Sequence, residues 1–472
     1  MGEAKGFLKH PRQDVGHRPL EQRVHDYREC TLPLSADALR QQAARCMDCG
    51  VPFCHAAGCP VQNEIPDVND LVYRGSWEEA CRLLHATNNF PEITGRICPA
   101  PCESACTLSI NDSPVLIQHI ELQVAERGFE RGWIHPLPAS DRTGASVAVI
   151  GSGPSGLAVA QQLARAGHAV VVFEADERVG GLLRYGIPEF KLEKRILDRR
   201  LYQLAAEGIR FETGVEVGAD LSVRYLKRTF DAVCLAVGAR QPRCLSIPGA
   251  EQSNVLLALD YLSAQNRLCT GEPSEASVPI DAADKDVVIL GGGATGFDCI
   301  GTARRQGAKR ITQLEIQPRR PIERPASIPW PQWPRLHDEL AASDLGCEQR
   351  WNVLTTELVG EGNRVEQVHA REVEWEPAGD RWQMREISGS DFTLAADLVI
   401  LALGFVHAVH DGLVHDLGVR LDERGNIRTD EYQTSVPWVF AAGDAVSGAS
   451  WVAGAIHAGR QAADAADRWV RS

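Results

Sequence analysis

Apolar residues in the first third of the chain recur at helical spacing, and no stretch there has the pattern of a strand. The spacing predicts a helix over residues 34–45, two short helices within 66–88, and a further helix over 114–132. The second helix of the pair opens with S-W-E-E from Ser76, a capping-box pattern. A helical region is therefore expected up to about residue 142, followed by a linker rich in Pro and Gly.

The pattern changes at residue 145, where a continuous β-rich run begins. A strand over 146–150, a glycine-rich turn, a helix over 157–166 and a strand over 168–173 make one βαβ unit. The same order returns with a strand over 286–290, a second glycine-rich turn, a helix to residue 306 and a strand over 310–316. The sequence thus predicts an internal duplication of a nucleotide-binding unit.

Three more apolar runs end in glycine, at residues 232–238, 398–404 and 439–443, as buried parallel strands do. Alternation between residues 347 and 397 predicts antiparallel strands. The predicted fold is α/β: a helical domain followed by two doubly wound domains, the second inserted in the first. The expected boundaries are 1–143 for the helical domain, 144–280 and 405–472 for the first doubly wound domain, and 281–404 for the second.

Composition narrows the choice of function. The chain has 472 residues with 49 Lys+Arg and 63 Asp+Glu, a net charge of −14, which argues against nucleic acid as a partner. The N-terminus lacks the features of a signal peptide, and no run of about 18 apolar residues predicts a membrane span. Fourteen cysteines in such a chain favour metal or redox chemistry over disulfides, so we expect a cytoplasmic protein.

Half of the cysteines gather in one short part of the chain, spaced C-x2-C-x4-C-x4-C and then C-x3-C-x3-C. They are Cys46, Cys49, Cys54, Cys59, Cys98, Cys102 and Cys106. Short C-x2-C spacings and a proline after Cys59 and Cys98 favour iron–sulfur clusters, and structural zinc is the alternative. Seven thiolates are one short of two four-ligand sites, so the eighth ligand is Cys30, Cys81 or a carboxylate.

Each βαβ unit carries a dinucleotide fingerprint. The first fingerprint comprises Gly151, Gly153, Pro154 and Gly156, at the turn into the helix. Glu174 ends the second strand, where its carboxylate can accept a hydrogen bond from a ribose hydroxyl. Gly180-Gly181 predicts a second close approach of backbone to ligand. The alternative is a glycine turn that serves packing alone.

The second fingerprint comprises Gly291, Gly293, Ala294, Thr295 and Gly296. Arg319 and Arg320 follow its second strand and suit the 2′-phosphate of NADP(H), although Glu315 could serve NAD and the arginines could form a solvated loop. Gly443 and Asp444 end the last apolar run, where the acid contacts a flavin, caps a helix, or does both. No spacing indicates a catalytic triad or carboxylate pair, so no catalytic side chain is assigned.

Longer motifs show that the chain resembles the family of small (β) subunits of NADPH-dependent glutamate synthase. The stretches are A-R-C-M-D-C-G-V-P-F-C-H (44–55), L-V-Y-R-G-S-W-E-E-A (71–80), H-A-T-N-N-F-P-E-I-T-G-R-I-C-P (85–99), G-G-L-L-R-Y-G-I-P-E-F-K-L (180–192), T-Q-L-E-I-Q-P-R (312–319) and Y-Q-T-S-V-P-W-V-F-A-A-G-D (432–444). The resemblance runs nearly end to end. The chain departs from the family pattern at Ala294 and over residues 448–460, including His457, which leaves the contacts at the flavin edge open.

The resemblance implies two [4Fe-4S] clusters, FAD at the first fingerprint and NADPH at the second. By position, Cys46, Cys49, Cys54 and Cys106 would hold one cluster, and Cys59, Cys98 and Cys102 the other. Glu121 would be the eighth ligand, with Gln123 as its rival. The implied function is electron input to a large (α) subunit that makes glutamate, within a hetero-oligomer. The alternatives are another flavin and iron–sulfur oxidoreductase, of the NADPH:ferredoxin type, and a zinc-stabilised nucleotide-binding adaptor without turnover.

Overall fold

The helical domain surrounds helix α8, whose buried residues include Ile120 and Val124. The computed structural model describes residues 2–3, 5–272, 280–334, 336, 345–379 and 381–472. Its N-terminal elements are α1 (Gly6–Lys9), α2 (Leu20–Arg23), α3 (Ala36–Ala44), η1 (Cys54–Gly58), α4 (Ile65–Arg74), α5 (Trp77–Thr87), α6 (Pro91–Ile97), α7 (Pro101–Ser104), η2 (Thr107–Ile110) and α8 (Ile117–Glu130). The predicted helices are confirmed, and no strand precedes residue 146 in the described part of the chain.

A serine precedes both α3 and α5, but its side chain caps only α3. Ser35 accepts from the backbone N–H of Ala38 and caps α3, as its sequence predicts. Ser76 precedes α5, but its side chain makes no capping hydrogen bond, so the predicted capping box is wrong. Ser76 has φ −80° and ψ 60°, whereas a capping residue takes an extended conformation.

The first nucleotide unit is a parallel sheet with strand order β14-β4-β1-β2-β3. Its elements are β1 (Ser146–Ile150), α9 (Pro154–Arg165), β2 (Ala169–Phe173), α10 (Leu182–Tyr185), α11 (Lys194–Ala206), β3 (Arg210–Glu212), α12 (Val223–Thr229), β4 (Ala232–Leu235), α16 (Leu413–Leu417), β14 (Val439–Ala441), α17 (Asp444–Ser447) and α18 (Val452–Arg471). Val147 and Val149 pack toward α9 and α18, whereas Ala148 and Ile150 pack toward α12 and α16 on the opposite face.

The second nucleotide unit repeats this arrangement with the order β5-β13-β6-β7-β8, again parallel. Its elements are β5 (Val255–Leu257), α13 (Ala258–Cys269), β6 (Asp286–Leu290), α14 (Ala294–Arg305), β7 (Arg310–Glu315), β8 (Cys347–Trp351) and β13 (Leu398–Leu401). The domain start predicted at residue 281 stays a prediction, and β5, which precedes it, already pairs in this sheet.

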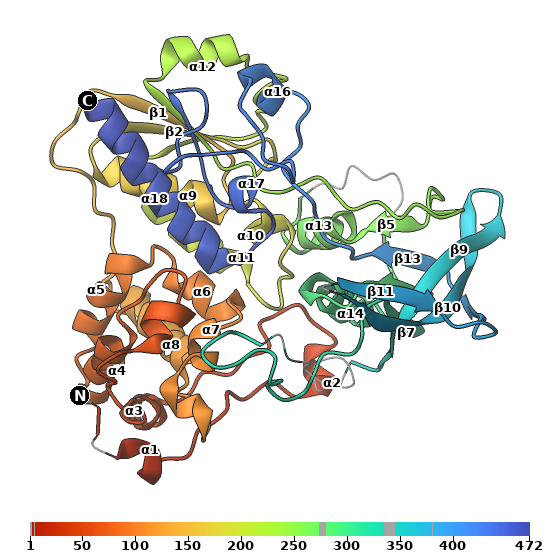
Figure 1. Cartoon of the computed structure of the whole chain (residues 1–472). Coiled ribbons are helices and arrows are strands. Elements are labelled where there is room, and N and C mark those ends of the chain that lie inside the picture. Colours follow the sequence, from red (N-terminus) through yellow and green to blue (C-terminus); the bar gives the residue numbers. More distant parts are fainter. Residues whose placement is uncertain (1, 4, 273–279, 335, 337–344, 380) are drawn as a thin grey trace.

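A small antiparallel sheet extends from the second unit (Figure 1). It contains β9 (Val353–Glu361), β10 (Arg364–Ala378), β11 (Arg381–Glu386) and β12 (Phe392–Ala395). The antiparallel strands predicted between about residues 347 and 397 are confirmed for β9 to β12, but β8 instead joins the parallel sheet beside β7. The half-buried β8 extends the parallel sheet of the nucleotide unit. The chain turns at Asn352, which has φ 57°, and the antiparallel strands begin only after this residue.

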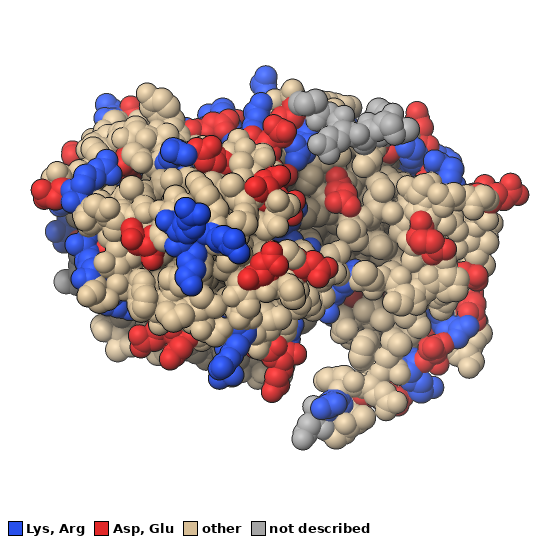
Figure 2. All heavy atoms as spheres, turned by 90° about the horizontal axis from the view of Figure 1, so that it is seen from above, with Lys and Arg blue, Asp and Glu red and all other residues tan. Residues whose placement is uncertain are grey.

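Two chain segments connect the nucleotide units, and they run side by side where Pro242 bridges to Phe405. The second unit is therefore inserted in the first, as predicted. Figure 2 shows a face on which basic and acidic side chains are interspersed, and the surface is hollowed between the two units. Within the described residues, every helix is too short or too polar to cross a membrane.

Candidate cofactor sites

Cys46, Cys49, Cys54 and Cys106 come together in the helical domain. The first two lie in the loop after α3, Cys54 begins η1, and Cys106 precedes η2. Their thiol groups lie near enough to interact electrostatically with one another. Burial raises the pKa of Cys46 to about 11 and that of Cys54 to about 12, so the free thiols keep their protons until a metal centre displaces them.

Cys59, Cys98, Cys102 and Glu121 form a second set. All four line one cavity, together with Asn63, Gln118 and Ala453. The first three lie at the end of η1, the end of α6 and within α7. Gly58 permits this arrangement, because a Cβ there would lie 2.6 Å from the Cα atom of Cys102.

Glu121 is 7% exposed as a residue, and its carboxylate oxygen Oε1 is buried with no hydrogen-bond partner among the described residues. Burial raises its pKa to about 7. A buried acceptor without a partner is costly unless something binds it, and a cluster iron would do so. Its role as the eighth ligand stays a prediction.

The rivals for that role lie elsewhere. Cys30 contacts the second nucleotide unit, where the guanidinium of Arg305 in α14 donates to its sulfur at 3.3 Å. The sulfur of Cys81 lies 3.7 Å from Nδ1 of His85. Gln123 does not line the second cavity, whereas Gln118 does and donates to the Cys98 carbonyl at 2.6 Å.

In the described part of the chain, no three His, Cys, Asp or Glu side chains are close enough together to hold a single metal ion. A cubane cluster makes a different demand, because each of its four ligands binds a different iron atom. Four possible ligands around one cavity, as in the second set, suit a cubane cluster.

The glycine loop of the first unit has the geometry of a pyrophosphate site. Gly151 has φ 98°, and a Cβ there would lie 2.5 Å from the carbonyl oxygen of Ala236. No atom lies within 4 Å of a Cβ placed on Gly153, so this side of the loop is open to a ligand. The helix α9 begins at Pro154, and the hydroxyl of Ser155 in its first turn is buried without a partner. Loop, helix dipole and unpaired hydroxyl together suit a bound diphosphate.

Two distant turns pack on this loop. A Cβ on Gly181 would lie 2.9 Å from the Cα atom of Gly153, and one on Gly443 would lie 2.8 Å from the Cβ atom of Ser155. Both glycines have positive φ, 51° and 68°. The fold thus brings together three turns that are far apart in the sequence.

The two acids of this unit already have backbone partners. Glu174 is buried and accepts from the backbone N–H and hydroxyl of Ser152 and from the N–H of Asp176. Asp444 accepts from the N–H and hydroxyl of Ser450, in the turn before α18, and burial raises its pKa. The N-cap residue of α18 is Trp451 and no side chain caps this helix, so the predicted helix cap by Asp444 is wrong, and the contact of Asp444 with a flavin stays a prediction.

The second glycine loop reproduces the first. A Cβ on Gly291 would lie 2.4 Å from the Ala402 carbonyl oxygen, and one on Gly296 would lie 2.4 Å from the Gly291 carbonyl oxygen. The space beside Gly293 is open within 4 Å. Ala294 and Thr295 form the first turn of α14. The two glycine loops are therefore alike also in the open space beside Gly153 and Gly293, where a pyrophosphate would approach.

Glu315 ends β7 and faces the second loop, where it accepts from the backbone N–H of Gly292 and, at 2.9 Å, from that of Gln317. It therefore occupies the position that Glu174 has in the first unit. Arg319 is exposed and Arg320 half-buried in the loop beyond. In the sequence the two arginines lie four and five residues beyond Glu315, and their role at a 2′-phosphate stays a prediction.

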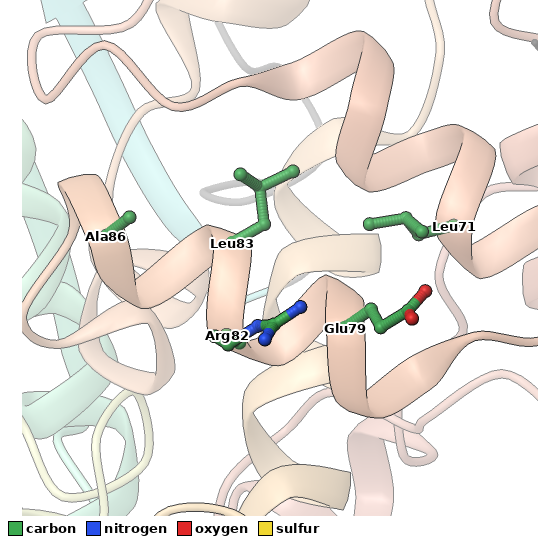
Figure 3. Close-up of a pocket in the computed structure, with 5 residues that line it drawn as sticks. All are labelled: Leu71, Glu79, Arg82, Leu83 and Ala86. Atoms are coloured by element: carbon green, nitrogen blue, oxygen red, sulfur yellow. The ribbon is translucent and has the colours of Figure 1, made fainter.

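A further hollow lies on the surface of the helical domain. Leu71, Glu79, Arg82, Leu83 and Ala86 line it on α4 and α5, as Figure 3 shows. None of the predicted ligands lies there.

Several contacts in these sites have no signal in the sequence. Ala453 reaches the second cavity from α18, more than three hundred residues after Cys102 along the chain. Ser155 lies within the first fingerprint, but the sequence does not show that its hydroxyl is buried without a partner. Trp330 donates its indole N–H to the Cys106 carbonyl at 3.3 Å, across domains. Long-range contacts of this kind leave no local pattern.

Comparisons with known proteins match this architecture. The family described as pyridine nucleotide-disulphide oxidoreductase matches residues 145–462, and the family described as dihydropyrimidine dehydrogenase domain II, 4Fe-4S cluster, matches residues 23–133. The FprA protein of Mycobacterium tuberculosis, solved in complex with NADPH, has a TM-score of 0.55 at 19% identity and covers 69% of this chain and 84% of its own. That likeness concerns the fold. The class is therefore an oxidoreductase with two dinucleotide-binding units and an iron–sulfur type helical domain.

Two sequence relatives define the particular family. The glutamate synthase [NADPH] small chain of Mycobacterium tuberculosis is 50% identical, over 100% of this chain and 96% of its own length. The glutamate synthase [NADH] of Schizosaccharomyces pombe is 43% identical, over 98% of this chain and 22% of its own length. This chain belongs to the family of glutamate synthase small chains.

Proposed function

We propose that the chain is the electron-input subunit of a glutamate synthase. It takes electrons from NADPH and delivers them through two [4Fe-4S] clusters to a large subunit that makes glutamate from glutamine and 2-oxoglutarate. Bound FAD would accept a hydride from NADPH and release its electrons singly, which is chemistry that the cofactor supplies. The chain itself binds, orients and shields these groups.

One observation carries the proposed path: the second cysteine cavity lies against the first nucleotide unit. Ala453 of α18 lines that cavity, and Cys59 and Cys98 pack against the hydrophobic core that contains α9 and α18. Cys46, Cys54 and Cys106 of the first set pack in the core of the helical domain, which Cys59 and Cys102 also contact. Electrons would therefore pass from the flavin unit to the Cys59–Cys98–Cys102–Glu121 set and then to the Cys46–Cys49–Cys54–Cys106 set.

The nucleotide units have complementary tasks. In the first, the N-terminus of α9 and the Ser155 hydroxyl would hold the FAD pyrophosphate, while Glu174 faces its ribose. In the second, the N-terminus of α14 would hold the coenzyme pyrophosphate, with Arg319 and Arg320 toward the 2′-phosphate.

The partner follows from the relatives. The Mycobacterium tuberculosis relative is named a small chain, which implies a large one, and the Schizosaccharomyces pombe protein contains a region like this chain within a polypeptide several times longer. We infer that the large subunit of this protein supplies the acceptor site within a hetero-oligomer in the cytoplasm.

The test is NADPH oxidation by the native complex, purified through a tag on this chain. Glutamine and 2-oxoglutarate are added singly and then together. We expect rapid oxidation only with both present, and glutamate as the product. A coloured complex that reduces artificial acceptors but ignores both substrates would contradict the glutamate synthase role and point to another electron acceptor. A colourless, zinc-containing protein would contradict electron transfer altogether.

A further inference from the structure

A loop of the second nucleotide unit extends across to the helical domain. We call residues 320–334 the bridging loop; it follows β7 and the predicted coenzyme arginine Arg319. In Figure 1 it is the blue-green segment that lies beside α7. Arg324 in this loop donates to the Ser104 carbonyl of α7 at 3.0 Å and to the Ile328 carbonyl of its own loop at 3.3 Å. One cation therefore fixes both the shape of the loop and its attachment.

The loop then contacts the first cysteine set directly. The indole N–H of Trp330 donates to the carbonyl oxygen of Cys106 at 3.3 Å. Its ring packs on Phe53, with 4.6 Å between ring centroids. Phe53 immediately precedes Cys54, so a single tryptophan contacts the side chain beside Cys54 and the backbone of Cys106.

A second tryptophan anchors the other end. The ring of Trp333 lies edge-on to that of Trp451, at 4.5 Å between centroids. Trp451 precedes α18, two residues before Ala453 of the second cavity. The bridging loop of the second nucleotide unit therefore contacts both other domains, next to both cysteine sets.

We propose that Trp330 is a positioning residue for the first cluster. Through Phe53 and the Cys106 carbonyl, it holds the bridging loop over the first cysteine set, keeps water from that set, and fixes the second nucleotide unit beside it. The inference rests on the proposed function only in that the first set holds a cluster. The loop contact itself does not depend on the cofactor.

The experiment compares Trp330→Ala, Trp330→Phe and the control Trp382→Ala in the purified complex. Trp382 lies on β11, is 67% exposed, and is remote from both cysteine sets in sequence and fold. The first readout is hydrogen exchange of backbone amides in residues 98–110 and 320–334. The second is the loss of cluster absorbance in air, together with the electron paramagnetic resonance spectrum of the reduced clusters.

Trp330→Ala should speed exchange in both segments by about tenfold, because a ring contact and a hydrogen bond are lost together. It should also speed cluster loss several-fold and alter the spectrum of one cluster only. Trp330→Phe keeps the ring contact and should fall between wild type and Trp330→Ala. Trp382→Ala should match wild type in every measurement.

The proposal would be overturned if Trp330→Ala and Trp382→Ala showed equal rates of hydrogen exchange and equal rates of cluster loss. Faster exchange with an unchanged rate of cluster loss would overturn the shielding role. A wild-type complex without iron would overturn the proposed function and the role at the cluster, while hydrogen exchange would still decide whether the contact holds the loop.

Discussion

The two nucleotide units share their architecture but differ in what encloses the glycine loop. Each has five parallel strands in corresponding order, and each ends its second strand with an acid that accepts from the loop backbone. In the first unit, turns at Gly181 and Gly443 pack on the loop. In the second, the Trp351 ring at the end of β8 approaches Gly292. A loop enclosed by distant parts of the chain suits a resident cofactor, whereas a less enclosed loop suits a coenzyme that exchanges.

The charges beyond the acids differ as well. Asp176 follows Glu174 and pairs with Arg267 at 2.9 Å, so its neighbourhood is already neutralised within the protein. Arg319 and Arg320 follow Glu315 in the second unit, where two cations come after the acid. The first arrangement suits a nucleotide without a 2′-phosphate, and the second suits one that carries it.

The first unit also docks differently on the helical domain. Arg200 of α11 donates to both carboxylate oxygens of Glu92 in α6, at 2.7 and 2.6 Å, and both side chains are fully buried. The second unit reaches the same domain through the bridging loop and through Arg305 of α14, which donates to the Asp26 carbonyl at 2.9 Å. A fully buried ion pair thus joins the first unit to the helical domain, whereas these contacts of the second unit are only partly buried.

The largest expected effect comes from Gly153→Ala, compared with Gly293→Ala. Both positions have ordinary backbone angles and open space for a methyl group, so both variants should fold. The added methyl obstructs the pyrophosphate in each case. Gly153→Ala should be purified without flavin colour, whereas Gly293→Ala should keep its flavin and show a KM for NADPH raised by about tenfold or more. Loss of flavin from Gly293→Ala would contradict the assignment of the two units.

Breaking the docking of the first unit should have the next largest effect. Arg200→Met leaves Glu92 buried without a partner and should cost about 3–5 kcal/mol of unfolding free energy. Its control is Arg199→Met, because Arg199 pairs with the partly exposed Glu126 of the same helical domain. That change should cost about 1 kcal/mol or less. Denaturant unfolding with tryptophan fluorescence measures both, and equal losses would show that the buried pair has no special role.

Removing the two cations of the second unit should lower coenzyme affinity without affecting flavin. The double variant Arg319→Ala with Arg320→Ala loses charge-assisted contacts to the 2′-phosphate, each of about 1.5–3 kcal/mol. KM for NADPH should rise by about tenfold or more, and KM for NADH should change little. Steady-state kinetics with both coenzymes gives the ratio. A parallel rise for NADH would place these arginines elsewhere.

The sequence predicted the fold well because its signals are local. Apolar runs that end in glycine specify buried parallel strands, and the strands predicted from residues 146, 286 and 439 are all present. It failed at β8 and Ser76, where the outcome depends on sheet pairing and on one backbone angle. These are tertiary effects that override a local preference.

The candidate sites divide in the same way. Cysteine spacing identified which thiols gather, and the structure brings them into the two sets expected from the resemblance. Spacing could not show that Ala453 joins the second cavity or that Trp330 reaches Cys106, because those contacts join segments more than two hundred residues apart. Glu315 is the intermediate case. Strand alternation raised the question of which way it faces, and only the structure shows that it faces the loop.

The smallest expected effect tests that orientation. Glu315→Gln keeps an oxygen that can accept from the N–H of Gly292 but removes a negative charge near the 2′-phosphate site. Two charges about 4 Å apart in water interact by about 1 kcal/mol, so the preference for NADPH over NADH should rise by about fivefold, and less at high salt. The matched change Glu174→Gln in the first unit should leave this ratio unchanged. If Glu315→Gln instead shifts the preference toward NADH, the Glu315 carboxylate helps to bind NADPH. The ribose sites of the two units would then be more alike than Arg319 and Arg320 of the second unit suggest.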